Sequence, residues 1–164
     1  MTEAICWGKK THRSHDNLGL SCALAESLAM FGAEAGRDIV LDGSLFGMGR
    51  GAGNAKTELL ADFLNKRFST AYDIAVLLDV IEKYIVPLKQ NIHWGYDLPM
   101  FVCGCEHAHV DNVFHLQAKY KISAKDMYAI IGSMTHEART RYGTGYPKAD
   151  LTLLEQAKEA FFKL

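Results

Sequence analysis

The chain has 164 residues, which is enough for a domain with a hydrophobic core of its own. Its 18 basic and 19 acidic side chains leave a formal net charge of −1, so the sequence gives no electrostatic footprint for nucleic acid or for an anionic membrane surface. The first residues lack a signal-peptide pattern, and no apolar run approaches the ~20 residues of a membrane span. We therefore expect a soluble, cytoplasmic protein whose four cysteines are reduced thiols.

The first part of the chain, residues 1–69, alternates helical and strand patterns. Apolar residues recur at three- and four-residue spacing over 20–31, which predicts an amphipathic helix capped by Asp16 or by the Asn that follows it. The apolar run at 39–41 is typical of a short strand buried on both faces, as in parallel sheets. A second amphipathic helix is expected over 55–68, so this part is predicted to be an α/β segment.

From residue 70 onward the patterns are helical. Predicted helices cover 72–88, 110–120, 123–142 and 150–164. Pro87 is expected to close the first of them, Ser123 is expected to cap the third together with Asp126, and Gly143 is a stop signal between the last two. The segment 94–99 is expected to be a turn that carries two large aromatic residues. The sequence thus predicts two parts, an α/β segment at 1–69 and a helical domain at 70–164.

Two polar stretches follow the predicted strand ends. Residues 13–20 contain His15 beside Asp16, and residues 47–54 alternate glycines with other residues before ending in Asn54. In α/β folds the polar residues at strand ends meet at one edge of the sheet and form sites there. We expect the two stretches to converge as two walls of one polar site.

Each of these features also has a structural explanation. His15 could be a metal ligand with Asp16 fixing its tautomer, or a polar residue ahead of a helix cap. Asn54 could bind a metal ion, or it could cap a helix that begins at Ala55. The glycines at 47, 49, 51 and 53 could let backbone N–H groups approach an anion, or they could permit a tight turn. Neither nucleotide-binding glycine fingerprint is met.

A second candidate metal site is the stretch from Cys103 to His109, which contains Cys103, Cys105, His107 and His109. In an extended chain these side chains would share one face, but successive ligands would lie about 7 Å apart, which is too far for one tetrahedral zinc ion. Buried thiols and surface histidines are the alternative interpretation. A small zinc protein is kept only as a minor hypothesis.

The two polar stretches together resemble the last part of the catalytic barrel in the HMG-CoA lyase-like aldolase superfamily. The matching residues are His15-Asp16-Asn17-Leu18-Gly19-Leu20 and the longer run from Leu41 to Glu58, which contains the glycine-rich stretch 47–54, and the closest similarity is to 4-hydroxy-2-oxovalerate aldolases. The segment Trp94–Pro99 is similar to the helical C-terminal region of the same proteins. The resemblance implies the C-terminal portion of a TIM (β/α)8 barrel followed by an all-helical domain.

The resemblance also implies a chemistry. A divalent metal ion, Mn or Mg, is expected on His15 and Asn54, with Gly51 and Gly53 lining the substrate. The reaction would be retro-aldol cleavage of a 4-hydroxy-2-oxo acid to pyruvate and an aldehyde by Lewis-acid catalysis. Tyr96 resembles a substrate-facing, catalytic tyrosine of the family, although an aromatic residue in that place could equally pack against the barrel.

The chain departs from the family in two ways. A complete barrel takes about 250 residues, so its first strands and their metal-binding Asp have no counterpart here. The first histidine of the family's His-x-His pattern is replaced by Arg13. We therefore expect little activity from the isolated chain, and either a homo-oligomer or a second protein chain that completes the site. The rival hypothesis is a non-catalytic module that binds a partner subunit.

Overall fold

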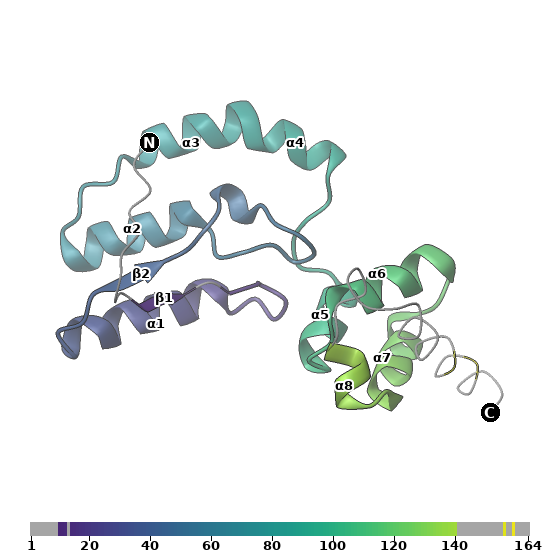
Figure 1. Ribbon diagram of the computed structural model, residues 1–164. Coiled ribbons are helices and arrows are strands. Elements are labelled where there is room, and N and C mark those ends of the chain that lie inside the picture. The colour runs from purple at the N-terminus through teal and green to yellow at the C-terminus, as the bar shows by residue number, and fades with distance from the viewer. Residues whose placement is uncertain (1–9, 13, 141–155, 157–158, 160–164) are drawn as a thin grey trace. The chain divides into compact units, whose positions relative to one another are not determined.

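The computed structural model describes residues 10–12, 14–140, 156 and 159, and the chain divides into two compact units after Gly95. Unit 1 contains both strands, β1 (Lys10–His12) and β2 (Ile39–Leu41) (Figure 1). Its helical segments are α1 (Ser21–Glu34), η1 (Leu45–Gly47), α2 (Thr57–Phe68), α3 (Ile74–Val80), η2 (Ile81–Ile85) and α4 (Val86–Asn91). Those of unit 2 are α5 (Leu98–Cys105), α6 (Val110–Lys119), α7 (Ala124–Ser133) and α8 (His136–Thr140).

Strands β1 and β2 are parallel, and α1 connects them. The register pairs Lys10 with Ile39 and His12 with Leu41, and the N–H of Asp42 donates to the carbonyl of His12 at 2.9 Å just beyond the strands. The strand predicted at 39–41 is confirmed. Two strands of three residues cannot close on themselves, so the described residues show a β-α-β unit followed by helices and not a barrel.

Helix α1 packs through its small residues. Ser21, Ala25 and Gly32 are its buried positions, and a Cβ on Gly32 would collide with the side chain of Ile39 on β2. Two of the large apolar residues that predicted this helix lie outside this buried face. Leu24 is 52% exposed and Phe31 is 64% exposed. The predicted helix is thus confirmed, but the face that it buries is the one with the small residues and not the stripe of large apolar residues.

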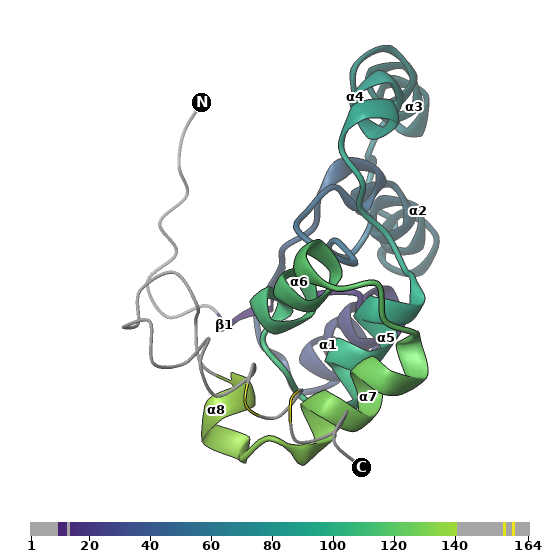
Figure 2. The ribbon, with the colours of Figure 1, turned by 90° about the vertical axis from the view of Figure 1, so that its right-hand side faces the viewer.

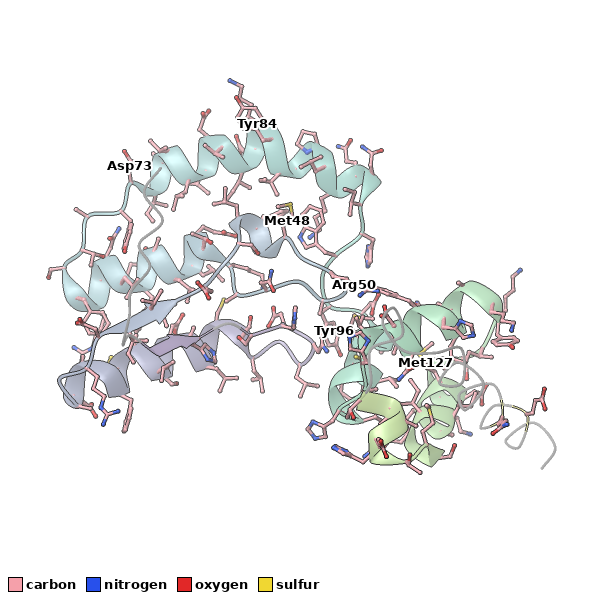
Figure 3. The ribbon with its side chains drawn as sticks, viewed as in Figure 1. Met48, Arg50, Asp73, Tyr84, Tyr96 and Met127 are labelled. Atoms are coloured by element: carbon pink, nitrogen blue, oxygen red, sulfur yellow. The ribbon has the colours of Figure 1, made fainter. Side chains whose placement is uncertain are left out.

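The helix predicted over 72–88 consists of α3, η2 and α4, which continue one another. Pro87 was expected to close the helix, but it lies in the first turn of α4. The turn before it is wider, since the N–H of Val86 donates to the carbonyl of Ile81 five residues back. Because proline has no N–H to donate, a π-helical turn at this position accommodates it without ending the helix. Figure 3 shows Tyr84 on the outer side of this helix, where it is 56% exposed.

A small core joins this helix to the loop after β2. Ile81, Ile85 and Trp94 are buried together, and Leu45 and Phe46 of η1 pack against them. Both views place α2 between this helix and α1 (Figures 1 and 2). This packing explains why the chain divides after Gly95, whereas the sequence pattern places the boundary near residue 70.

Unit 2 is a helical bundle around a core of Met100, Val113, Leu116, Met127, Ile130 and Ile131. The cap predicted at Ser123 is present, because its Oγ accepts from the N–H of Asp126 at 3.1 Å. The segment expected as a turn at 94–99 is non-helical up to Asp97, and its last two residues begin α5, which Asp97 caps by accepting from the N–H of Met100 at 2.8 Å. The predicted helix at 123–142 is interrupted at Met134, whose extended backbone separates α7 from α8.

Gly143 and most of the helix predicted at 150–164 lie outside the described residues. Across the described residues, no helix has both the length and the apolar character needed to cross a membrane.

Candidate functional site

His15 and Asn54 lie next to each other in the structure. An antiparallel bridge pairs their backbones, and the N–H of Asp16 donates to the carbonyl of Gly53 at 2.9 Å beside them. In antiparallel pairing, directly opposite residues place their side chains on the same face within about 5.5 Å. The expected convergence of the two polar stretches is therefore found.

The glycine-rich loop is folded tightly against Asn54. Gly47 and Gly53 have φ angles of +66° and +81°, which side-chain-bearing residues rarely adopt. A Cβ on Gly53 would collide with the carbonyl oxygen of Gly47, and a Cβ on Gly49 would lie 2.6 Å from the amide nitrogen of Asn54. These glycines permit the loop to approach itself and Asn54; Met48 and Arg50 mark its place in Figure 3.

The Asn54 side chain is buried and held in one orientation. Its Nδ2 donates to the carbonyl of Met48 at 3.0 Å and to Ser44 Oγ at 3.4 Å. Its Oδ1 is buried and has no hydrogen-bond partner. Asn54 does not cap α2, which begins at Thr57 after Lys56 as the N-cap residue. The cap interpretation of Asn54 was thus wrong, because the amide turns toward the glycine-rich loop.

A cavity of about 500 Å³ opens beside Asn54. It is lined by Asp42, Gly43, Ser44, Met48, Gly49 and Asn54. Asp42 follows β2 directly, so this cavity lies at the carboxyl end of the strand, where α/β folds place their sites.

Gly51 and Gly53, the residues expected to line the substrate, are buried within the loop. Their backbone contacts are structural, since the Gly51 carbonyl accepts from the N–H of Gly95 at 3.1 Å and the Gly53 carbonyl accepts from the N–H of Asp16. Their role as substrate-lining residues stays a prediction.

Asp16 joins several parts of the site. Its Oδ1 accepts from the N–H of Ser21 at 3.0 Å, and its Oδ2 accepts from Lys56 Nζ at 2.8 Å. The carboxylate therefore stabilises the first turn of α1 by accepting from Ser21. Its second partner is Lys56, whereas the sequence suggested that Asp16 would hydrogen-bond to His15. Burial acts to raise the pKa of Asp16, but the hydrogen bonds from Lys56 and Ser21 together hold that pKa below its usual 3.8. The same hydrogen bond raises the pKa of Lys56 above 10.5.

Lys56 and Ser44 are site residues that the sequence reasoning missed. Ser44 pairs its backbone with Lys56 in a parallel bridge and accepts from Asn54 through its hydroxyl. Lys56 lies 40 residues from Asp16 in the chain, so no spacing rule connects the two. The only local signal was a lysine directly after a Gly-Asn-Ala turn.

Tyr96 is the first residue of unit 2, and its side chain is 60% exposed. Both interpretations of Tyr96, a substrate-facing residue and an aromatic residue that packs against the barrel, stay predictions.

The zinc interpretation of the cysteine stretch is not supported. Cys103 and Cys105 lie in helix α5, where Cys103 is buried and donates its S–H to the carbonyl of Ala108 at 2.9 Å. Among the described residues, these four candidate ligands do not gather into a group that could hold a metal ion. His109 begins α6, and its Nδ1 accepts from the N–H of Asp111.

The residues at the bridge fit part of a divalent metal site. Within the described part of the chain, no group of three or more His, Cys, Asp or Glu side chains could hold a metal ion. The buried, unpartnered Oδ1 of Asn54 is an oxygen donor of the kind that Mn²⁺ and Mg²⁺ accept, and the imidazole of His15 is a nitrogen donor on the paired backbone segment. A divalent metal ion on these two residues stays a prediction.

The known proteins to which the chain is similar include several with the same name. No protein-family model matches the chain. The 4-hydroxy-2-oxovalerate aldolase of Marinomonas sp. (strain MWYL1) is 31% identical over 121 residues, which is 72% of this chain and 35% of that protein. The protein of the same name from Thermomicrobium roseum is 43% identical over 122 residues, or 73% of this chain and 33% of its own length.

A crystal structure described as the "N-terminal domain of a putative aldolase" from Bacteroides vulgatus matches with a TM-score of 0.56 and 32% identity. The match covers 67% of this chain and 35% of that one. The chain thus spans about a third of the length of the proteins that it matches.

Proposed function

The chain is a relative of the 4-hydroxy-2-oxovalerate aldolases over about a third of their length, and from this premise we propose that it forms one wall of a metal-dependent aldolase site. The site would cleave a 4-hydroxy-2-oxo acid to pyruvate and an aldehyde. The observation that carries the proposal is the buried Oδ1 of Asn54, which has no hydrogen-bond partner, in a residue whose backbone pairs with that of His15.

The residues of this chain would prepare the site in three ways. The Asn54 amide nitrogen donates to the Met48 carbonyl and to the Ser44 hydroxyl, so the amide oxygen is the atom left to bind a cation. His15 adds a nitrogen ligand from the opposite backbone segment. Gly49 lines the cavity without a side chain and so leaves room for a small 2-oxo acid. A divalent ion bound there supplies Lewis-acid polarisation of that substrate.

The site is incomplete in this chain, and we infer that a second chain or another copy completes a TIM-barrel-like wall. Strand β2 pairs only with β1 among the described residues, so its other edge has no strand beside it. The exposed Leu20, Leu24 and Phe31 of α1 form an uncovered apolar stripe. Unpaired edges and exposed apolar patches are the surfaces that folded proteins cover by association.

Paramagnetic NMR tests the proposed metal site. Mn²⁺ added to the isotope-labelled chain is expected to broaden the resonances of His15 and Asn54 first, and excess Mg²⁺ is expected to compete. His15→Ala and Asn54→Ala should each weaken the broadening about tenfold, because each removes one ligand. His136→Ala, at an exposed histidine of α8, is the matched control and should change nothing. Broadening that starts elsewhere would refute the site.

A pyruvate-release assay tests whether this chain contains a complete catalytic site. With Mn²⁺ and a 4-hydroxy-2-oxo acid, the isolated chain is expected to show little turnover, because two ligands and an open cavity do not enclose a substrate. Robust turnover would contradict that expectation and assign the whole activity to this chain.

A non-catalytic interaction module is the alternative function. It is favoured by the α3–α4 helix, where Val76 is 56% exposed and Leu78 is 50% exposed. Light scattering after size exclusion discriminates, because a solitary monomer at high concentration would argue against both a module of this kind and self-assembly.

A further inference from the structure

Asp16, the residue after His15, and Lys56, two residues after Asn54, form an ion pair. The Lys56 Nζ lies 2.8 Å from Asp16 Oδ2, and the aspartate side chain is only 10% exposed. Through its own N–H, Asp16 also closes the backbone pairing of His15 with Asn54 by donating to the carbonyl of Gly53. One residue therefore contacts both walls of the site through two different groups.

Lys56 is fixed at its backbone as well as at its ammonium. Its N–H donates to Cys22 Sγ in the first turn of α1 at 3.2 Å, and its bridge with Ser44 ties it to the residue that orients Asn54. Its aliphatic stem runs along the glycine-rich loop, since a Cβ on Gly47 would lie 3.2 Å from Lys56 Cγ. The ion pair of the Lys56 ammonium with Asp16 thus holds the segment that follows Asn54 close to the segment that follows His15.

This pair differs from an ordinary surface ion pair. Lys66 and Asp62 on α2 are as close, at 2.7 Å, but their side chains are 75% and 46% exposed, and the two residues belong to the same helix. A pair within one helix cannot set the distance between two segments. The Asp16–Lys56 pair connects residues 40 positions apart, so its loss removes a tie between the two walls.

We propose that the Asp16–Lys56 ion pair is a positioning device that holds His15 and Asn54 at the spacing needed to share one divalent cation. This role rests on the proposed function, in which those two side chains are the ligands. In this role Asp16 and Lys56 are positioning residues and not ligands. They act through the backbone pairing of His15 with Asn54 and through their contacts with the residues where α1 and α2 begin.

The test combines two measurements on the full chain. Amide hydrogen exchange of the metal-free chain reports the tie itself, because the N–H of Asp16 is protected by the carbonyl of Gly53. Mn²⁺ broadening at His15 and Asn54 reports its consequence. The variants are Lys56→Met, which keeps the stem and removes the charge; Lys56→Arg, which restores a charged donor; Asp16→Asn; and Lys66→Met as the control at the exposed pair.

Lys56→Met and Asp16→Asn are expected to speed exchange of the amide at position 16 and to weaken Mn²⁺ binding, each about tenfold. Lys56→Arg is expected to restore both, and Lys66→Met to change neither. Circular dichroism confirms that each variant is folded.

Unchanged exchange in Lys56→Met would overturn the proposal. Faster exchange with unchanged Mn²⁺ binding would also overturn it, since the pair would then be structural only. If the unmodified chain does not bind Mn²⁺, the proposed metal site fails, and the exchange measurement alone decides whether the pair sets the spacing.

Discussion

Replacing Gly53 by alanine should destabilise unit 1 far more than the same change at Gly36. Both glycines have positive φ, +81° and +60° respectively, so each substitution places a Cβ in a left-handed conformation at about 1 kcal/mol. The surroundings differ. Nothing lies within 4 Å of a Cβ at Gly36, whereas a Cβ at Gly53 runs into the carbonyl oxygen of Gly47.

The collision sets the size of the difference. The atom that Gly53→Ala would meet is backbone, so it cannot move aside by a change of rotamer, and overpacking of this kind adds about 1–3 kcal/mol. We expect a loss of about 1 kcal/mol for Gly36→Ala and about 2–4 kcal/mol for Gly53→Ala. The second variant should also lose Mn²⁺ broadening, because the carbonyl that receives the Asp16 N–H belongs to Gly53.

Urea unfolding followed by circular dichroism measures both losses, with the free energy of unfolding taken by linear extrapolation. Both glycines belong to unit 1, so the same unit is compared in each case. Losses that agree within about 0.5 kcal/mol would refute the close approach of the loop to itself.

Three further outcomes are expected. Trp94→Phe should lower the free energy of unfolding by about 1–3 kcal/mol in urea titrations, because the carbonyl of Phe46 loses the indole N–H that donates to it at 3.0 Å; an unchanged midpoint would contradict this. The hydrogen bond from Tyr128 to Glu106 raises the pKa of that tyrosine above 10.0, so the stability it adds is present below pH 10 and is lost as pH rises through the raised pKa. NMR titration checks the shift, which Glu106→Gln should abolish. Phe31→Glu should change stability by less than about 0.5 kcal/mol, since the ring is 64% exposed, but should reduce any self-association seen by light scattering.

The local elements of unit 1 were largely readable from the sequence. The apolar run at 39–41 is a strand, and the glycine-rich loop does bring Asn54 next to His15. These features depend on short-range chemistry, namely β-branched residues in a strand and glycines at positive φ. The barrel implied by the family resemblance stays a proposal, because its other strands would have to come from outside the described residues.

What the sequence could not give was the choice of partners for polar and apolar side chains. Asp16 binds Lys56, which is 40 residues away, where proximity in the chain suggested His15. The stripe of large apolar residues on α1 predicted a helix, but the helix packs through Ala25 and Gly32, whose small size lets β2 approach closely. Periodicity identifies an apolar face, and only the assembled structure shows whether that face is covered.

Trp94 makes the glycine-rich loop optically visible. The indole is 2% exposed, donates to the carbonyl of Phe46 in η1, and lies with Lys89 Nζ 5.5 Å from its ring centroid. Any loosening of η1 would admit water to the ring and shift its fluorescence emission to longer wavelength. Subtracting the spectrum of a Trp94→Phe variant isolates this signal from the second tryptophan, so movements of the loop beside Asn54 can be followed in real time without an attached label.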